Sequence, residues 1–202
     1  MKLYYAPGAC SLAVHIALRE IGADFDSVAV DLARHVTADG ADYYGISPRG
    51  YVPLLQLGDG SRHTEVASLL QHVADLDPTQ ALIGTAGSSR RLMVIEWLSF
   101  VSTELHKAFS PWLWHKETAD STRRAVEDKL AERFGELDRL LAGQDWLAGD
   151  FSVADAYAFT IVNWANFLAI PLTPHPNLRA YLERVSKRPR VQDTLVAEGL
   201  LK

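Results

Sequence analysis

The sequence predicts an α/β domain followed by an all-helical domain. Across residues 1–78, short apolar strands alternate with helices and end in a hairpin, a pattern that gives a mixed sheet. Residues 78–87 are rich in Pro, Gly and small side chains, and beyond them apolar residues recur at helical spacing without a clear strand. We therefore expect one domain over residues 1–78, a linker over 79–87 and a helical-bundle domain over 88–202.

The first domain is expected to run β-α-β-α-β-β-α, with a mixed four-stranded sheet. The predicted strands are residues 2–5, 25–32, 54–57 and 61–64, and Gly58-Asp59-Gly60 is a hairpin signal between the last two. Helices are predicted from residue 10 to Gly22, which stops the first of them, and over residues 65–77, with a short helix within 34–44.

The second domain is predicted to hold five helices, over residues 90–109, 121–141, 153–168, 177–187 and 189–198. Pro111 should end or kink the first of these. Ser152 is placed to cap the third, with Asp155 reaching back to it and Phe151 acting as a hydrophobic staple. We expect Asp155 to have a structural role, so that replacing it destabilises the protein but does not abolish binding or catalysis.

Composition excludes several classes of function. With 48% hydrophobic and 22% charged residues, the chain reads as a soluble globular protein, and its net charge of -5 argues against general nucleic-acid binding. One cysteine cannot form an internal disulfide, a CxxC pair or a multi-cysteine zinc site, and the seven histidines lack ligand spacing, so no metal site is expected. No signal-peptide pattern or membrane-spanning apolar run is present, which makes the cytoplasm the expected location.

The single cysteine, Cys10, stands at the start of the first predicted helix, just after a strand and the turn Ala6-Pro7-Gly8-Ala9. Free N–H groups and the positive end of the helix dipole favour an anion there, so a thiol tends toward the nucleophilic thiolate. Free cysteines are also common as small buried apolar residues. The stretch alone leaves both interpretations open.

Motifs along nearly the whole chain resemble those of the bacterial beta-class glutathione S-transferases. Each motif is modest alone, but together and in order they are specific. They are MKLYYAPGACSL at the start, SPRGYVPLL at 47–55, TE at 64–65, EWLSF at 96–100, TELHKAFSP at 103–111, FSVADAYAFT at 151–160 and EGL near the C-terminus. The resemblance implies a thioredoxin-like first domain, an all-helical second domain and a homodimer.

The resemblance also implies roles for residues of the first domain. It places Cys10 beside the sulfur of bound glutathione, able to form a mixed disulfide with it. Val52-Pro53 is similar to the cis-proline motif of the thioredoxin fold, in which the backbone of Val52 would pair with the cysteinyl part of glutathione. Glu65 would face the γ-glutamyl ammonium, and Val66, where relatives often carry Ser or Gly, would contribute its backbone N–H. Tyr51 stands where relatives often have Gln and is counted with the glutathione-binding residues.

In the second domain the resemblance implies that His106 points into the active site. There it would polarise the glutathione sulfur or donate a hydrogen bond to it. Lys107 would meet a glutathione carboxylate or remain a solvated charge. The Thr103 hydroxyl would join the same face or bond back to its own helix. Ser99 replaces an Asn of many relatives and is counted with the glutathione-binding residues. The aromatic residues Phe109, Trp112, Trp114 and Trp164 are expected to line an electrophile pocket, although Trp164 is also consistent with ordinary core.

The function implied is a glutathione transferase that conjugates glutathione to apolar electrophiles, with glutathione-dependent peroxidase or thiol–disulfide exchange activity beside it. Its partners would be glutathione and small electrophiles, with no nucleic acid, membrane or metal. The alternatives are a dedicated glutathione-dependent isomerase, dehalogenase or ether-cleaving lyase, and a non-catalytic ligand-binding protein on the same fold.

Overall fold

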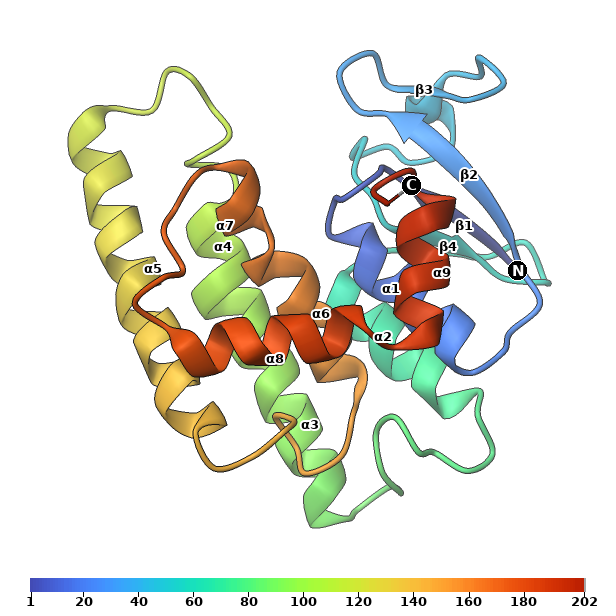
Figure 1. Ribbon diagram of the computed structural model, residues 1–202. Helices are drawn as coiled ribbons and strands as arrows, with labels where there is room; N and C mark the ends of the chain where they lie inside the picture. Colours follow the sequence, from blue (N-terminus) through green and yellow to red (C-terminus); the bar gives the residue numbers. More distant parts are fainter. Residues whose placement is uncertain (202) are drawn as a thin grey trace. The chain divides into compact units, whose positions relative to one another are not determined.

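The computed structural model describes residues 1–201, which form two compact units. One unit is Met1–Gln80 together with the segment from Arg188 onward, and the other is Ala81–Lys187. The sequence assigned the last helix to the helical domain, whereas in the structure α9 (Pro189–Ala197) packs against α1 (Ser11–Glu20) (Figure 1). None of the described helices combines the length and apolarity that crossing a bilayer requires.

A mixed sheet forms the centre of the first unit. In spatial order its strands are β3 (Val36–Thr37), β2 (Asp26–Asp31), β1 (Lys2–Tyr5), β4 (Leu54–Gln56) and β5 (Arg62–His63). β1 and β2 are parallel and the other neighbouring pairs are antiparallel. The mixed sheet is confirmed, but the prediction of four strands is wrong. Residues 34–44, where only a short helix was expected, also supply the two-residue β3 before the 3₁₀ turn η1 (Tyr43–Gly45).

Side chains alternate along each strand, so neighbouring residues point to opposite faces of the sheet. In the β1–β4 pair, Leu3 lies opposite Leu55 and Tyr4 lies opposite Leu54. Tyr4 and Leu54 join a core cluster with Tyr43 and other apolar residues, while Leu3 and Leu55 are fully buried on the other face. The helix α1 connects the parallel strands β1 and β2 and packs against α2 (Val66–Asp75).

Buried polar contacts fix α9 to the start of the chain. The Glu198 carboxylate, just past α9, accepts from the Gly8 backbone N–H at 2.9 Å and contacts His15 Nδ1 at 2.8 Å, with both acidic and imidazole side chains fully buried. Arg188 binds Glu20 through two hydrogen bonds of 2.8 Å. The final segment therefore holds both the loop before Cys10 and the end of α1.

The second unit is helical throughout its regular structure. Its elements are α3 (Ser89–Phe100), the π-helical segment η2 (Val101–His106), α4 (Lys107–Phe109), α5 (Asp120–Leu141), α6 (Val153–Val162), α7 (Trp164–Phe167) and α8 (Pro176–Ser186). Every residue of α6 is buried, and this helix contacts α3, η2, α7 and α8. It is therefore the core helix of the unit.

The N-terminus of α6 is capped as the sequence predicts. The Asp155 carboxylate accepts from the backbone N–H and the hydroxyl of Ser152, each at 2.8 Å. It also accepts from the Leu147 N–H and the Tyr181 hydroxyl, each at 3.0 Å. Burial raises the pKa of Asp155, and these hydrogen bonds oppose that rise.

Candidate functional site

Cys10 lies directly before α1 and against the segment that carries Val52 and Pro53. The loop between β1 and α1 turns through Gly8, whose φ is 70°, and the Ser11 hydroxyl closes it by bonding to the backbone of Ala6. The Cys10 thiol, partly buried, donates to the Val52 carbonyl at 3.2 Å. The helix N-terminus favours a thiolate, whereas the carbonyl favours a protonated thiol, so the two neighbours act on this group in opposite directions.

The Val52–Pro53 peptide bond is cis, as the resemblance implied. The backbone before it is held by Tyr43, whose hydroxyl donates to the Tyr51 carbonyl at 2.9 Å, and Val52 itself is buried. The Tyr51 side chain is 69% exposed. The first unit thus brings Cys10, Val52 and Pro53 together with an exposed aromatic side chain beside them.

Glu65 has a backbone conformation that is uncommon for a residue with a side chain. Its φ is 72° and its ψ is 108°, and it stands just before α2, which begins at Val66. Such a conformation costs on the order of 1–3 kcal/mol and is concentrated at functional sites. The Glu65 carboxylate is exposed and pairs with Arg49 at 3.1 Å. No side chain caps the start of α2, so its first backbone N–H groups are suited to an anion.

In the second unit, His106 lies in the segment that interrupts the predicted long helix. Residues 90–109 were expected to form one helix, but η2 inserts π-helical geometry between α3 and α4 and ends at His106. A π segment re-aims the side chains that follow it and is frequent at functional sites. The spacing of apolar residues could not predict this π-helical segment.

Burial and the nearby Lys107 charge lower the pKa of His106 from 6.5 to about 4. The ring is therefore neutral at pH 7. Its Nδ1 lies 2.7 Å from the Tyr157 hydroxyl, a contact across 51 residues that sequence reasoning missed. Tyr157 lies in the FSVADAYAFT motif. Its hydroxyl in a largely apolar helical segment was the sequence feature that could have indicated a polar partner.

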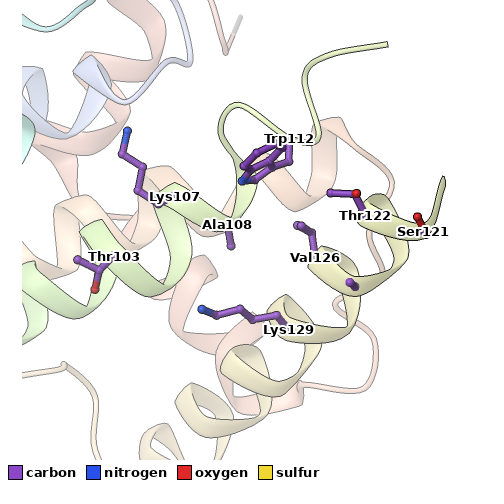
Figure 2. A pocket seen from close by; sticks show the side chains of 9 residues that line it. Thr103, Lys107, Ala108, Trp112, Ser121, Thr122, Val126 and Lys129 are labelled. Atoms are coloured by element: carbon purple, nitrogen blue, oxygen red, sulfur yellow. The ribbon is translucent and has the colours of Figure 1, made fainter. Parts of the chain in front are cut away.

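Three of the four predicted pocket aromatics form one cluster, in which Phe109 and Trp114 both contact Trp164. The Trp164 ring makes edge contacts with the rings of His106, Phe109 and Trp114 at centroid distances of 5.1, 5.8 and 5.5 Å. Phe109 and Trp164 are buried, whereas Trp114 is 45% exposed. The fourth, Trp112, lies elsewhere: it lines an open hollow of the same unit together with Thr103 and Lys107 (Figure 2).

The remaining predicted residues make local contacts. The Thr103 hydroxyl donates to the Ser99 carbonyl at 3.0 Å, which is the alternative in which it bonds to its own helix. The Ser99 hydroxyl likewise donates to the Ile95 carbonyl at 2.9 Å. Within residues 1–201, no group of three or more His, Cys, Asp or Glu side chains is arranged to hold a metal ion.

Comparison with known proteins identifies the class. Residues 8–76 match the family model "Glutathione S-transferase, N-terminal domain" and residues 100–189 match "Glutathione S-transferase, C-terminal domain". Together with full-length relatives, these matches show that the chain belongs to the glutathione S-transferase family.

Individual relatives extend over the whole chain. The chain is 41% identical over 201 residues to glutathione S-transferase GstA of Escherichia coli O157:H7, covering 99% of this chain and 100% of that protein. A beta-class glutathione S-transferase structure from Sphingomonas chungbukensis has 42% identity and a TM-score of 0.94, with both chains covered completely. A sphingomonad glutathione S-transferase solved in complex with glutathione gives the same identity, TM-score and coverage. The resemblance to the beta class is thus confirmed.

Proposed function

We propose that this protein is a glutathione transferase that conjugates glutathione to apolar electrophiles. The observation that carries the proposal is the contact between Cys10 and the backbone of Val52, next to the cis-proline, in the unit that matches the family's N-terminal domain. Similar proteins are named as glutathione S-transferases, and one of them is solved with glutathione. No cofactor other than glutathione, which acts as cosubstrate, is part of the proposal.

The glutathione peptide is assigned to the first unit. The cysteinyl part pairs with the backbone of Val52, strand to strand, beside the exposed ring of Tyr51. Glu65 receives the γ-glutamyl ammonium, in exchange for its present partner Arg49, and the start of α2 at Val66 receives the γ-glutamyl carboxylate. The strained backbone of Glu65 supports this assignment, since such strain is retained where it serves a function.

In conjugation the thiol of glutathione releases its proton to solvent, and the thiolate forms a bond to the electrophilic carbon. The leaving group departs with the bonding electron pair or, where the electrophile is an activated double bond, the displaced electron pair takes up a proton. We assign His106 the role of a neutral hydrogen-bond donor to that sulfur. A phenol is a better donor than a neutral imidazole, so we infer that Tyr157 donates to Nδ1 and that Nε2 carries the ring proton. A pKa of about 4 excludes an imidazolium at pH 7. His106 then stabilises the thiolate and does not act as a base.

The electrophile surface is assigned to the aromatic cluster around Trp164, with Trp114 as its exposed edge. Phe109 supports that cluster from within the core. A glutathione-binding role stays a prediction for Lys107, Thr103 and Ser99. A place in the electrophile pocket stays a prediction for Trp112. A cytoplasmic homodimer that detoxifies electrophiles is the expected setting, by analogy with the family.

Cys10 is assigned chiefly to thiol–disulfide exchange. Replacing it with Ala should lower glutathione-dependent disulfide exchange by roughly tenfold or more, because only a thiolate at this place can form the mixed disulfide. Conjugation should fall much less, since the nucleophile there is the sulfur of glutathione. The two rates are measured on the same preparation, and an equal loss in both assays would overturn this division of labour.

The function itself is tested by a glutathione-affinity column and an electrophile panel run with and without glutathione. Retention on the column and glutathione-dependent conjugation of several apolar electrophiles support a general transferase. Passage through the column without retention would favour a ligand-binding protein. Turnover of one substrate by isomerisation, dehalogenation or ether cleavage, with no conjugation, would favour a narrower enzyme.

A further inference from the structure

Arg49 and Glu65 form an exposed ion pair beside the residues assigned to the glutathione peptide. Arg49 Nη1 donates to Glu65 Oε1 at 3.1 Å, and the two side chains are 66% and 71% exposed. Within the described residues the Arg49 guanidinium has no other hydrogen bond or ion pair. An exposed pair joined by one contact contributes little to stability, so it can exchange readily for another partner.

The backbone is fixed on both sides of this pair, so the Arg49 side chain is the part that can turn. Glu65 stands directly before α2, and its carbonyl accepts from the Leu69 N–H at 2.9 Å. Arg49 lies in a turn that the Gly50 N–H closes by donating to the Ser47 carbonyl at 2.8 Å. The long, flexible and largely exposed side chain of Arg49 can leave Glu65 without any change in either backbone segment.

The γ-glutamyl group of glutathione, which the proposed function assigns to this place, is a zwitterion. Its α-carbon carries both an ammonium and a carboxylate, so a ligand that places the ammonium on Glu65 brings the carboxylate beside it. The Arg49 guanidinium already lies within hydrogen-bond distance of Glu65 and is therefore close to the arriving carboxylate. A guanidinium presents a planar fork of N–H donors that matches the geometry of a carboxylate.

We propose that Arg49 exchanges partners when glutathione binds: it releases Glu65 to the γ-glutamyl ammonium and itself binds the γ-glutamyl carboxylate. Four charges then alternate in sign, from the guanidinium through the ligand's carboxylate and ammonium to the Glu65 carboxylate. The two side chains together select an α-amino acid head group, and their ion pair is the unliganded form of that recognition site. This inference rests on the proposed function, since it requires glutathione to bind in the first unit.

The test measures affinity by isothermal titration calorimetry for glutathione and two analogues. γ-Aminobutyryl-cysteinylglycine keeps the ammonium but lacks the α-carboxylate, and glutaryl-cysteinylglycine keeps that carboxylate but lacks the ammonium. Arg49→Gln should weaken binding of glutathione and the glutaryl peptide about threefold and leave the aminobutyryl peptide no weaker, because only the first two bring a carboxylate to the guanidinium. Glu65→Gln should weaken glutathione and the aminobutyryl peptide but spare the glutaryl peptide.

The matched control is Arg190→Gln. Arg190 is 58% exposed, pairs with Asp193 at 3.3 Å and belongs to the same unit, so this variant removes the same charge at another place. It should leave all three affinities unchanged. Circular dichroism confirms that each variant is folded before titration.

Unchanged or tighter binding of glutathione by Arg49→Gln would overturn the exchange, and so would an equal loss for the aminobutyryl peptide or the same loss in Arg190→Gln. Full affinity of Glu65→Gln for the aminobutyryl peptide would also overturn it, because the ammonium would then lie elsewhere. The wild-type titration separates this inference from the proposed function. No glutathione binding by the wild type overturns both, whereas normal binding with no effect of Arg49→Gln overturns this inference alone.

Discussion

The partly buried histidine of η2, His106, should make the protein lose stability as the pH falls below 7. In the folded chain the pKa of His106 is lowered to about 4, mainly by burial, from the 6.5 of an exposed imidazole. A group with a lowered folded pKa contributes its full stability above the unfolded pKa, and that contribution is lost as the pH falls toward the folded pKa. Between pH 6.5 and 4 the unfolded chain binds a proton at this ring that the folded chain does not.

The size of the effect follows from these two values. Integrating the proton linkage for this group alone from pH 7 to pH 5 gives a loss of about 2 kcal/mol in the free energy of unfolding. The replacement His106→Asn removes the titration while keeping a polar atom close to the position of Nδ1, next to Tyr157. We therefore expect the variant to lose about 2 kcal/mol less than the wild type between these pH values.

The measurement is urea-induced unfolding followed by circular dichroism at pH 7 and at pH 5. The quantity compared is the change in unfolding free energy between the two pH values, so that any overall destabilisation of the variant cancels. His63→Asn, on the exposed strand β5, is the matched control and should keep the wild-type loss. The reasoning is refuted when His106→Asn loses as much stability between pH 7 and pH 5 as the wild type does.

Two further predictions concern buried carboxylates. Asp155→Ala leaves four donors, including the Leu147 N–H and the Tyr181 hydroxyl, without their acceptor, so the unfolding free energy should fall by about 3 kcal/mol or more in thermal or urea unfolding. Conjugation measured well below the melting temperature should stay near wild type, and loss of activity in fully folded protein would contradict a structural role. Glu198→Gln turns an amide nitrogen toward the Gly8 N–H or toward His15, which should cost about 1–3 kcal/mol. An unchanged melting temperature would show that these contacts contribute nothing.

Features with a local physical cause could be predicted from the sequence. The position of Cys10 before a helix follows from the preceding Pro and Gly and from the apolar spacing after it. The cap of α6 follows from Ser152 and Asp155 three residues apart. In each case neighbouring residues determine the structure.

Features that depend on distant contacts or on small changes in backbone geometry could not be predicted this way. The pairing of β3 involves only two residues, Val36 and Thr37, which is too short to show a period. The packing of α9 involves the contact between Glu198 and His15, which are 183 residues apart in the sequence. No pattern in either segment predicts this contact. Trp112 and Trp114 are two residues apart in the sequence, yet Trp112 lines the hollow with Thr103 and Lys107, whereas the Trp114 ring contacts Trp164.

Two local departures from regular geometry coincide with residues that the family resemblance had picked out for other reasons. Glu65 carries a positive φ that a glycine would adopt without strain, yet this position holds a carboxylate. The regular helix predicted over residues 90–109 is replaced by a π segment that ends at His106. Both arrangements are less favourable locally than the regular alternative. The surrounding fold must therefore stabilise them, and this supports the proposal that Glu65 and His106 hold these positions in order to bind glutathione.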